Sequence, residues 1–258
     1  MATGDLSAER ISSLLRTERF GRALHMYDSV VSTNDLAKQL ADEGAAEGTA
    51  VIAEEQLAGR GRGGRAWVSP PGGLWLSILL RPTLPVEAWP LLGVVLALAS
   101  CRAVETAAGL RPGVKWPNDV MVGPRKLGGI LVEATPAFAI GGIGLNANLT
   151  DAALPDPVGT LATSIQMETG RGIDLNVLAA AVLSSSEEYY RRLPAEKASL
   201  LAEFRDRSVV LGRRVHITGS ASFDGLAEAI DESGALLVRT PAGLQVLRAG
   251  EVSIRVAE

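Results

Sequence analysis

The feature that most constrains the fold is a pair of strongly apolar segments that follow each other near the middle of the chain. Leu74 to Leu80 (LWLSILL) predicts a strand that ends at Arg81-Pro82. Residues 87–109 predict a helix whose apolar residues occur nearly all round, so other elements should cover it on several sides. Segments of this kind indicate the interior of a layered domain with a sizeable core.

Shorter patterns complete that domain, which we expect to span residues 1–207. Its predicted fold class is α/β (α+β), a mixed sheet flanked by helices. Helical patterns occur at 6–17, 36–44 (after a turn at 32–35 with four suitable N-cap residues), 174–193 and 195–205, and strand patterns at 21–30, 49–55, 114–116, 126–133 and 138–145. From Val209 onward, short β-branched runs alternate with Gly, Asp and Ser turns, which predicts a second domain at 208–258 folded as a small β-barrel.

Composition and charge exclude several classes of protein. The net charge of −4 gives no overall attraction to nucleic acid or anionic lipid. The one cysteine, Cys101, can form neither an internal disulfide nor a Cys-rich zinc site, and the two histidines are far apart. The N-terminus lacks signal-peptide features, and Leu91 to Cys101 is about half as long as a bilayer span. We therefore expect a cytoplasmic protein without membrane association.

The most distinctive segment is a loop rich in glycine and arginine, GRGRGGRAW at residues 59–67. Glycines let backbone N–H groups approach an anion, and arginines donate paired hydrogen bonds to phosphate or carboxylate. The segment alone fits a solvated loop, an RGG-type RNA-binding segment or a site for a small phosphate-bearing ligand. It is short and lies between apolar strands, which favours a site on a folded scaffold.

Three further segments carry polar residues next to glycines or strands. KWPND at 115–119 combines a lysine, an amide and a carboxylate, but it also fits a strand followed by a turn. KLGGILVE at 126–133 begins with a lysine that should reach an anion at the strand end, although a β-bulge with a surface lysine has the same pattern. GIGLNAN at 142–148 is a glycine-rich strand that ends in amides, a pattern that also marks tight packing.

These segments, in this order and together with Ser32-Thr33-Asn34 and Gln56, resemble the biotin–protein ligases, or biotin–[acetyl-CoA-carboxylase] ligases. The resemblance covers roughly residues 25–258 and includes the small C-terminal domain, which it implies is an SH3-like β-barrel. It implies a reaction in two steps. Biotin and MgATP form biotinoyl-5′-AMP, and a lysine of the biotin carboxyl carrier domain of a carboxylase then takes the biotin. Such a reaction needs a cationic site, because two anions must meet.

The resemblance also implies roles for individual residues. Lys126 bridges the biotin carboxylate and the α-phosphate and is the first candidate for catalysis, with Arg62 and Arg65. Asp119 is the candidate metal ligand, for Mg²⁺. The implied biotin-binding residues are Ser32, Thr33, Asn34, Gln56, Gly59, Arg60, Gly61, Arg62, Lys126, Gly129 and Leu131. The implied ATP-binding residues are Arg62, Arg65, Trp67, Lys115, Asn118, Lys126 and Asn146.

Other functions remain open at this stage. Some members of the family carry an N-terminal winged helix-turn-helix domain and repress transcription, but only about 20 residues precede the first predicted strand, so we expect no operator binding. Lipoate–protein ligase shares the scaffold and the acyl-adenylate chemistry. A ligand-binding or RNA-binding module without turnover is the alternative from another class. Some relatives dimerise by extending the central sheet, so a homodimer is possible.

Overall fold

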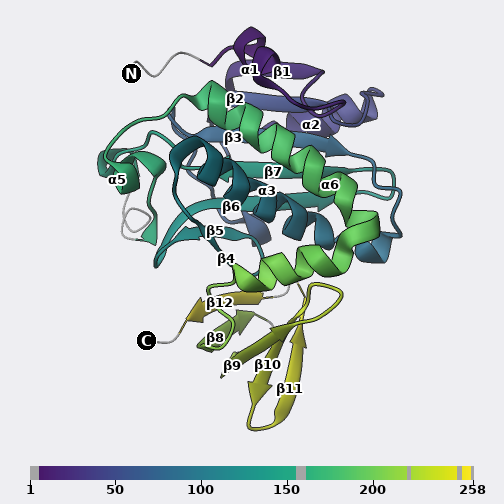
Figure 1. Ribbon diagram of the computed structural model, residues 1–258, viewed down its shortest axis with the longest axis vertical. Helices are drawn as coiled ribbons and strands as arrows, with labels where there is room; N and C mark the ends of the chain where they lie inside the picture. Colours follow the sequence, from purple (N-terminus) through teal and green to yellow (C-terminus); the bar gives the residue numbers. More distant parts are fainter. Residues whose placement is uncertain (1–5, 155–160, 220–221, 249–251, 257–258) are drawn as a thin grey trace.

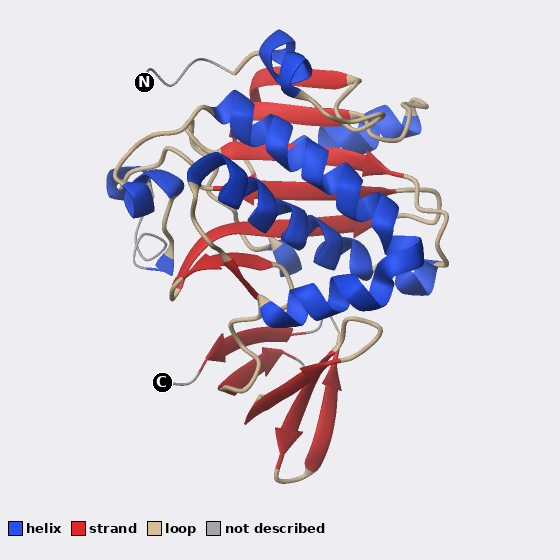
Figure 2. Ribbon diagram, viewed as in Figure 1, coloured by secondary structure: helices blue, strands red, loops and turns tan. Residues whose placement is uncertain are grey.

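The computed structural model describes residues 6–154, 161–219, 222–248 and 252–256. Figures 1 and 2 show a large α/β unit with a smaller all-β unit beneath it. The large unit is a mixed sheet of seven strands in the order β1-β2-β3-β7-β6-β5-β4. Its strands are β1 (Leu24–Val30), β2 (Ala50–Gln56), β3 (Leu74–Leu80), β4 (Gly113–Lys115), β5 (Asp119–Val122), β6 (Arg125–Ala134) and β7 (Ala139–Leu145). The predicted mixed α/β fold is therefore confirmed.

The two faces of the sheet carry different helices. α3 (Leu91–Ala108) and α6 (Leu175–Asp206) lie side by side across one face, as Figure 1 shows, and α2 (Thr33–Asp42) packs on the other. Successive strand residues point to opposite faces. Ile52 accordingly packs in the core beneath α3 and α6, whereas its neighbour Val51 packs with Ala37 of α2. β3 is buried at every position, as its apolar sequence predicts.

The helix predicted at 87–109 is the core helix α3, preceded by a 3-10 turn at Val86–Ala88. By length and composition alone, the stretch Val86–Ala108 could cross a membrane, but 67% of its most apolar window is buried inside the protein. Such burial is that of a core helix, as the all-round apolar pattern predicts.

The prediction of two helices at 174–193 and 195–205 corresponds to a single helical run, α6, with a kink. Pro194 lies inside the run, and the backbone at Glu196 is non-helical, with φ −119° and ψ 23°. Proline removes one hydrogen bond and crowds the preceding turn, so the axis changes direction there.

Two elements are absent from the sequence-based prediction. β5 follows directly on the Pro-Asn turn of KWPND and pairs with β4 and β6, so four strands, not three, lie between residues 113 and 145. Its four residues are too few to show a period. The short helix α5 (Ile165–Thr169) was also missed; Ser164 caps it, its side chain accepting from the N–H of Met167. α1 (Ala8–Leu14) lies within the predicted leading helix.

The small unit is an antiparallel sheet with the strand order β11-β10-β9-β8-β12. Its strands are β8 (Arg214–Gly219), β9 (Phe223–Ile230), β10 (Leu236–Thr240), β11 (Gly243–Leu247) and β12 (Val252–Val256). The predicted all-β texture from Val209 is confirmed, while closure into an SH3-like barrel stays a prediction.

The junction between the two units is built from specific contacts. The indole N–H of Trp116 donates to the carbonyl of Gly234 at 2.9 Å, and Arg205 Nε donates to the carbonyl of Ile230 at 2.8 Å. The backbone N–H of Val209 also donates to the carbonyl of Val114 at 2.9 Å. The KWPND segment therefore touches the second unit directly.

Cys101, on α3, is expected to resist alkylation in the folded protein. Its side chain is fully buried, and desolvation raises the pKa of the thiol to about 12. Since an unfolded thiol has a pKa near ~8.5, the free energy of unfolding should fall as the pH rises from about 8.5 towards 12. Iodoacetamide at pH 8 should label the protein only as fast as it unfolds, whereas urea-unfolded protein reacts at once. Rapid labelling of folded protein would contradict this burial.

Candidate functional site

A cavity of about 910 Å³ lies over the sheet on the face that carries α2 and the glycine-rich loop. Of the predicted site residues, only Gly59 is not among those that line it. The predicted residues that line it are Ser32, Thr33, Asn34, Gln56, Arg60, Gly61, Arg62, Arg65, Trp67, Lys115, Asn118, Asp119, Lys126, Gly129, Leu131 and Asn146. Segments more than 100 residues apart in the sequence thus line one cavity.

One end of the cavity is built on the N-terminus of α2, where Ser32 is the N-cap. Ser32, Thr33 and Asn34 are buried, and their polar atoms form a network. The N–H and hydroxyl of Thr33 both donate to Gln56 Oε1, at 2.9 and 3.1 Å. Ser77 Oγ lies 2.8 Å from Thr33 Oγ1 and 2.6 Å from Asn34 Oδ1. Held in this way, these groups suit a polar ring that needs hydrogen bonds in a fixed direction.

The glycine-rich loop folds back on itself as a short hairpin, residues 59–67. The N–H of Gly61 donates to the carbonyl of Arg65 at 2.7 Å, and the N–H of Trp67 donates to the carbonyl of Gly59 at 2.9 Å. The turn between them is a 3-10 turn at Arg62–Gly64. Gly63 and Gly64 adopt φ of 65° and 72°, a region that favours glycine.

Gly59 has a structural role in this hairpin rather than a position in the cavity. A Cβ placed on it would lie 2.5 Å from the carbonyl oxygen of Trp67 and 2.7 Å from Ser69 Oγ. Only glycine permits the two ends of the hairpin to approach so closely. Gly59 thus packs closely against the opposite end of the hairpin, and its implied contact with biotin stays a prediction.

The three arginines of the hairpin point to different partners. Arg60 forms a bidentate pair with Asp35 of α2. Arg62 lies deeper, and its Nη1 donates to Asn118 Oδ1 at 3.1 Å. Burial, assisted by the neighbouring charge of Arg65, lowers the pKa of Arg62, while Asp119 opposes this shift. Arg62 therefore carries a charge with reduced solvation, which an anion would stabilise.

Lys126 lies at the centre of the cavity, at the start of β6. Its Nζ is 2.6 Å from Asp119 Oδ1 and 4.9 Å from the ring centroid of Trp67. The side chains of Lys126 and Asp119 are 31% and 21% exposed, so the pair is accessible from the cavity. Asp119, the candidate metal ligand, is thus engaged with the candidate catalytic lysine. The described residues contain no group of three or more His, Cys, Asp or Glu that could hold a metal ion.

Some polar groups around Lys126 already form hydrogen bonds within the protein. Asn146 is buried, and its Nδ2 donates to the carbonyl of Thr163 at 2.9 Å. Trp67 Nε1 is buried without a hydrogen-bond partner among the described residues. Its ring lies against the backbone of Gly144, where a Cβ would approach Nε1 to 2.7 Å. This close packing on Gly144 fixes the Trp67 ring as one wall of the cavity.

Glycines of β7 form another wall of the cavity. Gly142 and Gly144 both line it, and a Cβ on Gly142 would lie 2.4 Å from Asn34 Oδ1. Gly141 faces the opposite side of the strand, towards the core, where an added Cβ would lie 2.4 Å from Leu96 of α3. The glycine-rich segment is therefore explained by close approach on both faces of one strand.

Gly142→Ala is expected to lower the free energy of unfolding by about 1–3 kcal/mol, because the new methyl group displaces the buried Asn34 amide. Urea denaturation measures this change. Gly93→Ala is the matched control, since Gly93 lies in α3 and nothing stands within 4 Å of its added Cβ. That substitution should stabilise the protein by about 0.5–1 kcal/mol. Equal stability of the two variants would contradict the close packing at Gly142.

Some lining residues were not predicted. Leu154, Leu161 and Ala162 follow the amides of GIGLNAN and have no local signature. Arg213 comes from the second unit, just before β8, and also lines the cavity. A sequence pattern could not place it there, because its position depends on how the two units meet.

The balance of charge in the cavity favours anions. One carboxylate, Asp119, occurs among the lining residues, against a set of cations. These are Arg60, Arg62, Arg65, Lys115, Lys126 and Arg213. A cluster of this kind in a protein of net charge −4 is a local feature and suits phosphate or carboxylate groups.

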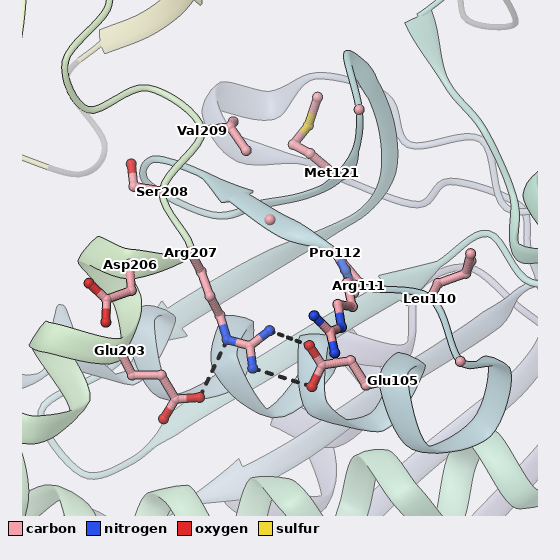
Figure 3. A pocket seen from close by; sticks show the side chains of 13 residues that line it. Glu105, Leu110, Arg111, Pro112, Met121, Glu203, Asp206, Arg207, Ser208 and Val209 are labelled. Carbon is pink, nitrogen blue, oxygen red and sulfur yellow. Dashed lines mark hydrogen bonds and ion pairs between the residues drawn. The ribbon is translucent and has the colours of Figure 1, made fainter.

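A second cavity, of about 880 Å³, lies where α3 and α6 end (Figure 3). It contains none of the predicted site residues. Arg207 lies in it between two carboxylates, with Nη1 at 2.7 Å from Glu105 and Nε at 3.4 Å from Glu203. The guanidinium is thus already neutralised, and the first cavity is the stronger candidate for chemistry.

Comparisons with known proteins agree with this geometry. Residues 26–148 match the family model described as "Biotin/lipoate A/B protein ligase family", and residues 210–255 match "Biotin protein ligase C terminal domain". The chain is 38% identical to a biotin–[acetyl-CoA-carboxylase] ligase of Paracoccus denitrificans, over 86% of this chain and 96% of the relative. It is 34% identical to a bifunctional ligase/repressor BirA of Bacillus spizizenii, over 97% of this chain and 80% of the relative.

A solved structure supports the same conclusion. The biotin protein ligase of Aquifex aeolicus in complex with biotin and ATP matches with a TM-score of 0.82 and 29% identity, over 92% of this chain and 100% of that one. Sequence, fold and site geometry therefore agree, and the chain belongs to the biotin protein ligase family of ATP-dependent ligases.

Proposed function

We propose that the cavity around Lys126 binds biotin and MgATP side by side and joins them as biotinoyl-5′-AMP. The observation that carries this proposal is the position of Lys126 and Arg62 between two differently built ends of one cavity. One end is the hydrogen-bonded network of Thr33, Asn34 and Gln56. The other contains Trp67 with its unpartnered N–H. A carboxylate and a phosphate that enter from the two ends meet at the cations.

The first step forms one bond and breaks another. A carboxylate oxygen of biotin attacks the α-phosphorus of ATP, and pyrophosphate leaves as the bond between the α-phosphorus and the bridging oxygen breaks. Lys126 and Arg62 reduce the repulsion between the two anions and stabilise the charge that builds up on the α-phosphate. Lys126 then exchanges its contact with Asp119, which lies 2.6 Å from its Nζ, for contacts with the two anions.

Mg²⁺ fits this site as a partner of the nucleotide. Asp119 offers one carboxylate, and Mg²⁺ in such sites is held by one or two carboxylates plus substrate phosphates. When bound, the ion neutralises phosphate charge and helps pyrophosphate to leave. The protein's own contribution remains the cationic side chains and the orientation of the two substrates.

The second step transfers biotin to a protein. The amine of an acceptor lysine attacks the carbonyl carbon of the mixed anhydride, AMP leaves, and the amine loses a proton. We propose that the acceptor is the biotin carboxyl carrier domain of a carboxylase in the cytoplasm, as the name of the Paracoccus relative suggests. We also propose a division into a catalytic domain at 1–207 and a C-terminal domain at 208–258, which contributes Arg213 to the cavity.

The experiment that tests this function measures pyrophosphate release from MgATP without any acceptor. Purified protein is given biotin or lipoate in separate reactions. Release with biotin and not with lipoate supports the proposal. Release with lipoate alone would assign the chain to the lipoate branch of the wider family, and release with neither would leave a binding protein without turnover.

A further inference from the structure

We propose that Asp35 and Glu133 are positioning residues that hold Arg60 and thereby keep the hairpin 59–67 over the cavity. We name Arg60, Asp35 and Glu133 the Arg60 clamp. The inference deepens the proposed function, on which it rests, because the hairpin would shield biotinoyl-5′-AMP from water. In the implied site Arg60 lies over biotin; in the clamp its guanidinium instead fastens the hairpin to the rest of the domain.

The geometry of the clamp is specific. Arg60 Nη1 lies 2.7 Å from Asp35 Oδ2, and Arg60 Nη2 lies 2.6 Å from Asp35 Oδ1. Arg60 Nη2 is also 3.7 Å from Glu133 Oε2. Two parallel hydrogen bonds from one guanidinium to one carboxylate fix both distance and orientation, which a single surface contact does not.

The clamp joins three elements that are distant in sequence. Asp35 lies in the first turn of α2, Glu133 lies near the end of β6, and Arg60 lies in the hairpin. Glu133 is tied to the biotin end of the cavity as well, since Asn34 Nδ2 donates to its Oε2 at 2.6 Å. Glu133 thus contacts both the hairpin, through Arg60, and Asn34 of the cavity wall.

Backbone contacts within the hairpin connect Arg60 to the two other arginines, Arg62 and Arg65. Arg60 and Ala66 form an antiparallel bridge, and the N–H of Gly61 donates to Arg65. A fixed Arg60 therefore limits the positions of Arg62 and Arg65. Among their own contacts, Arg62 Nη1 donates to the amide oxygen of Asn118 at 3.1 Å, and Arg65 Nε donates to the backbone carbonyl of Arg62 at 3.2 Å.

Charge keeps the clamp formed at neutral pH. The hydrogen bonds and charge of Arg60 lower the pKa of Asp35, against the opposing effect of partial burial. The same hydrogen bonds, which Arg60 donates to Asp35, raise the pKa of Arg60. Both partners remain ionised, and the side chains are 34% and 50% exposed. Salt should therefore weaken the clamp, and its contribution should be moderate.

The first readout is independent of activity. Trypsin cleaves after arginine, so opening of the hairpin exposes Arg60, Arg62 and Arg65 to cleavage. In Asp35→Asn and Glu133→Gln we expect cleavage in the hairpin to become about threefold to tenfold faster than in wild type, with the larger effect for Asp35→Asn. The control is Glu228→Gln, which disrupts a comparable exposed pair with Arg239, at 2.8 and 3.1 Å, in the small unit. It should leave hairpin cleavage unchanged.

The second readout separates positioning from chemistry. In a single turnover, Asp35→Asn should form biotinoyl-5′-AMP within about twofold of the wild-type rate. Without acceptor, continued pyrophosphate release should rise about threefold to tenfold, because the adenylate escapes or is hydrolysed sooner. Raising the salt concentration should bring wild type towards the variant.

Several outcomes would overturn the clamp. Unchanged tryptic cleavage in both variants would show that the carboxylates do not hold the hairpin. A single-turnover rate that falls in step with steady-state release would assign Asp35 to the chemistry instead. If wild type releases no pyrophosphate with biotin, the proposed function fails, while the trypsin comparison still decides whether the clamp exists.

Discussion

Lys126→Ala is expected to reduce biotin-dependent pyrophosphate release by about 10²–10³-fold, since removal of one preorganised charge at a reacting centre has effects of this size. Lys126 lies at the centre of the cavity, beside Asp119 and above Trp67. Without its ammonium, Asp119 adds an unbalanced negative charge next to two anionic substrates. The effect should therefore appear mainly in the rate of adenylate formation, measured as the pyrophosphate burst in a single turnover.

Two comparisons make this result specific. Lys126→Ala should keep the wild-type thermal unfolding midpoint within a few degrees, because the side chain is 31% exposed and leaves no large cavity. Lys197→Ala removes an exposed lysine of α6 and should release pyrophosphate as wild type does. A single Lys126→Ala variant with wild-type release would refute the assigned role.

Trp116→Ala is expected to lower the free energy of unfolding by about 3–5 kcal/mol. Trp116 is 2% exposed, and its indole N–H donates to the carbonyl of Gly234 in the small unit at 2.9 Å. The substitution removes a large side chain from the core and leaves a carbonyl without a donor at the junction. Urea denaturation followed by circular dichroism measures the loss of stability.

The control for this prediction is another buried tryptophan. Trp89 is 6% exposed, and its N–H donates at 3.0 Å to the carbonyl of Leu84, within the large unit. Trp89→Ala should destabilise the protein similarly but leave the junction intact. Only Trp116→Ala should also speed proteolysis between the two units and raise the KM for ATP, because Arg213 reaches the cavity from the small unit. Equal junction proteolysis in the two variants would contradict the coupling.

Much of the fold could be predicted from periodicity. The bounds of β3 coincide with the apolar run Leu74–Leu80, and the N-cap of α2 is Ser32, the first of four suitable N-cap residues at 32–35. β5 could not be predicted, because its four residues take their strand conformation from pairing with β4 and β6. The sequence predicted two helices separated at Pro194; that they form one continuous run, α6, depends on packing against α3.

The candidate site could be predicted as a set of segments but not as a set of contacts. Glycine and arginine in the hairpin indicated an anion site, yet nothing local showed that Arg60 would pair with Asp35 and Glu133. Those partners are brought close only by the fold. Nor did the sequence show that a side chain at position 59 would collide with the carbonyl of Trp67, a contact across the hairpin.

Gly141, Gly142 and Gly144 leave β7 without side chains on either face at these positions. Leu96 of the core helix touches the backbone at Gly141 from one side, while Gly142 and Gly144 face the cavity on the other. The Asn34 amide and the Trp67 ring rest directly on Gly142 and Gly144, so a shift of this strand moves two walls of the cavity. Mutations of the deep interior at this point should consequently behave as specificity mutations, and libraries aimed at new substrates can include helix positions that no ligand ever touches.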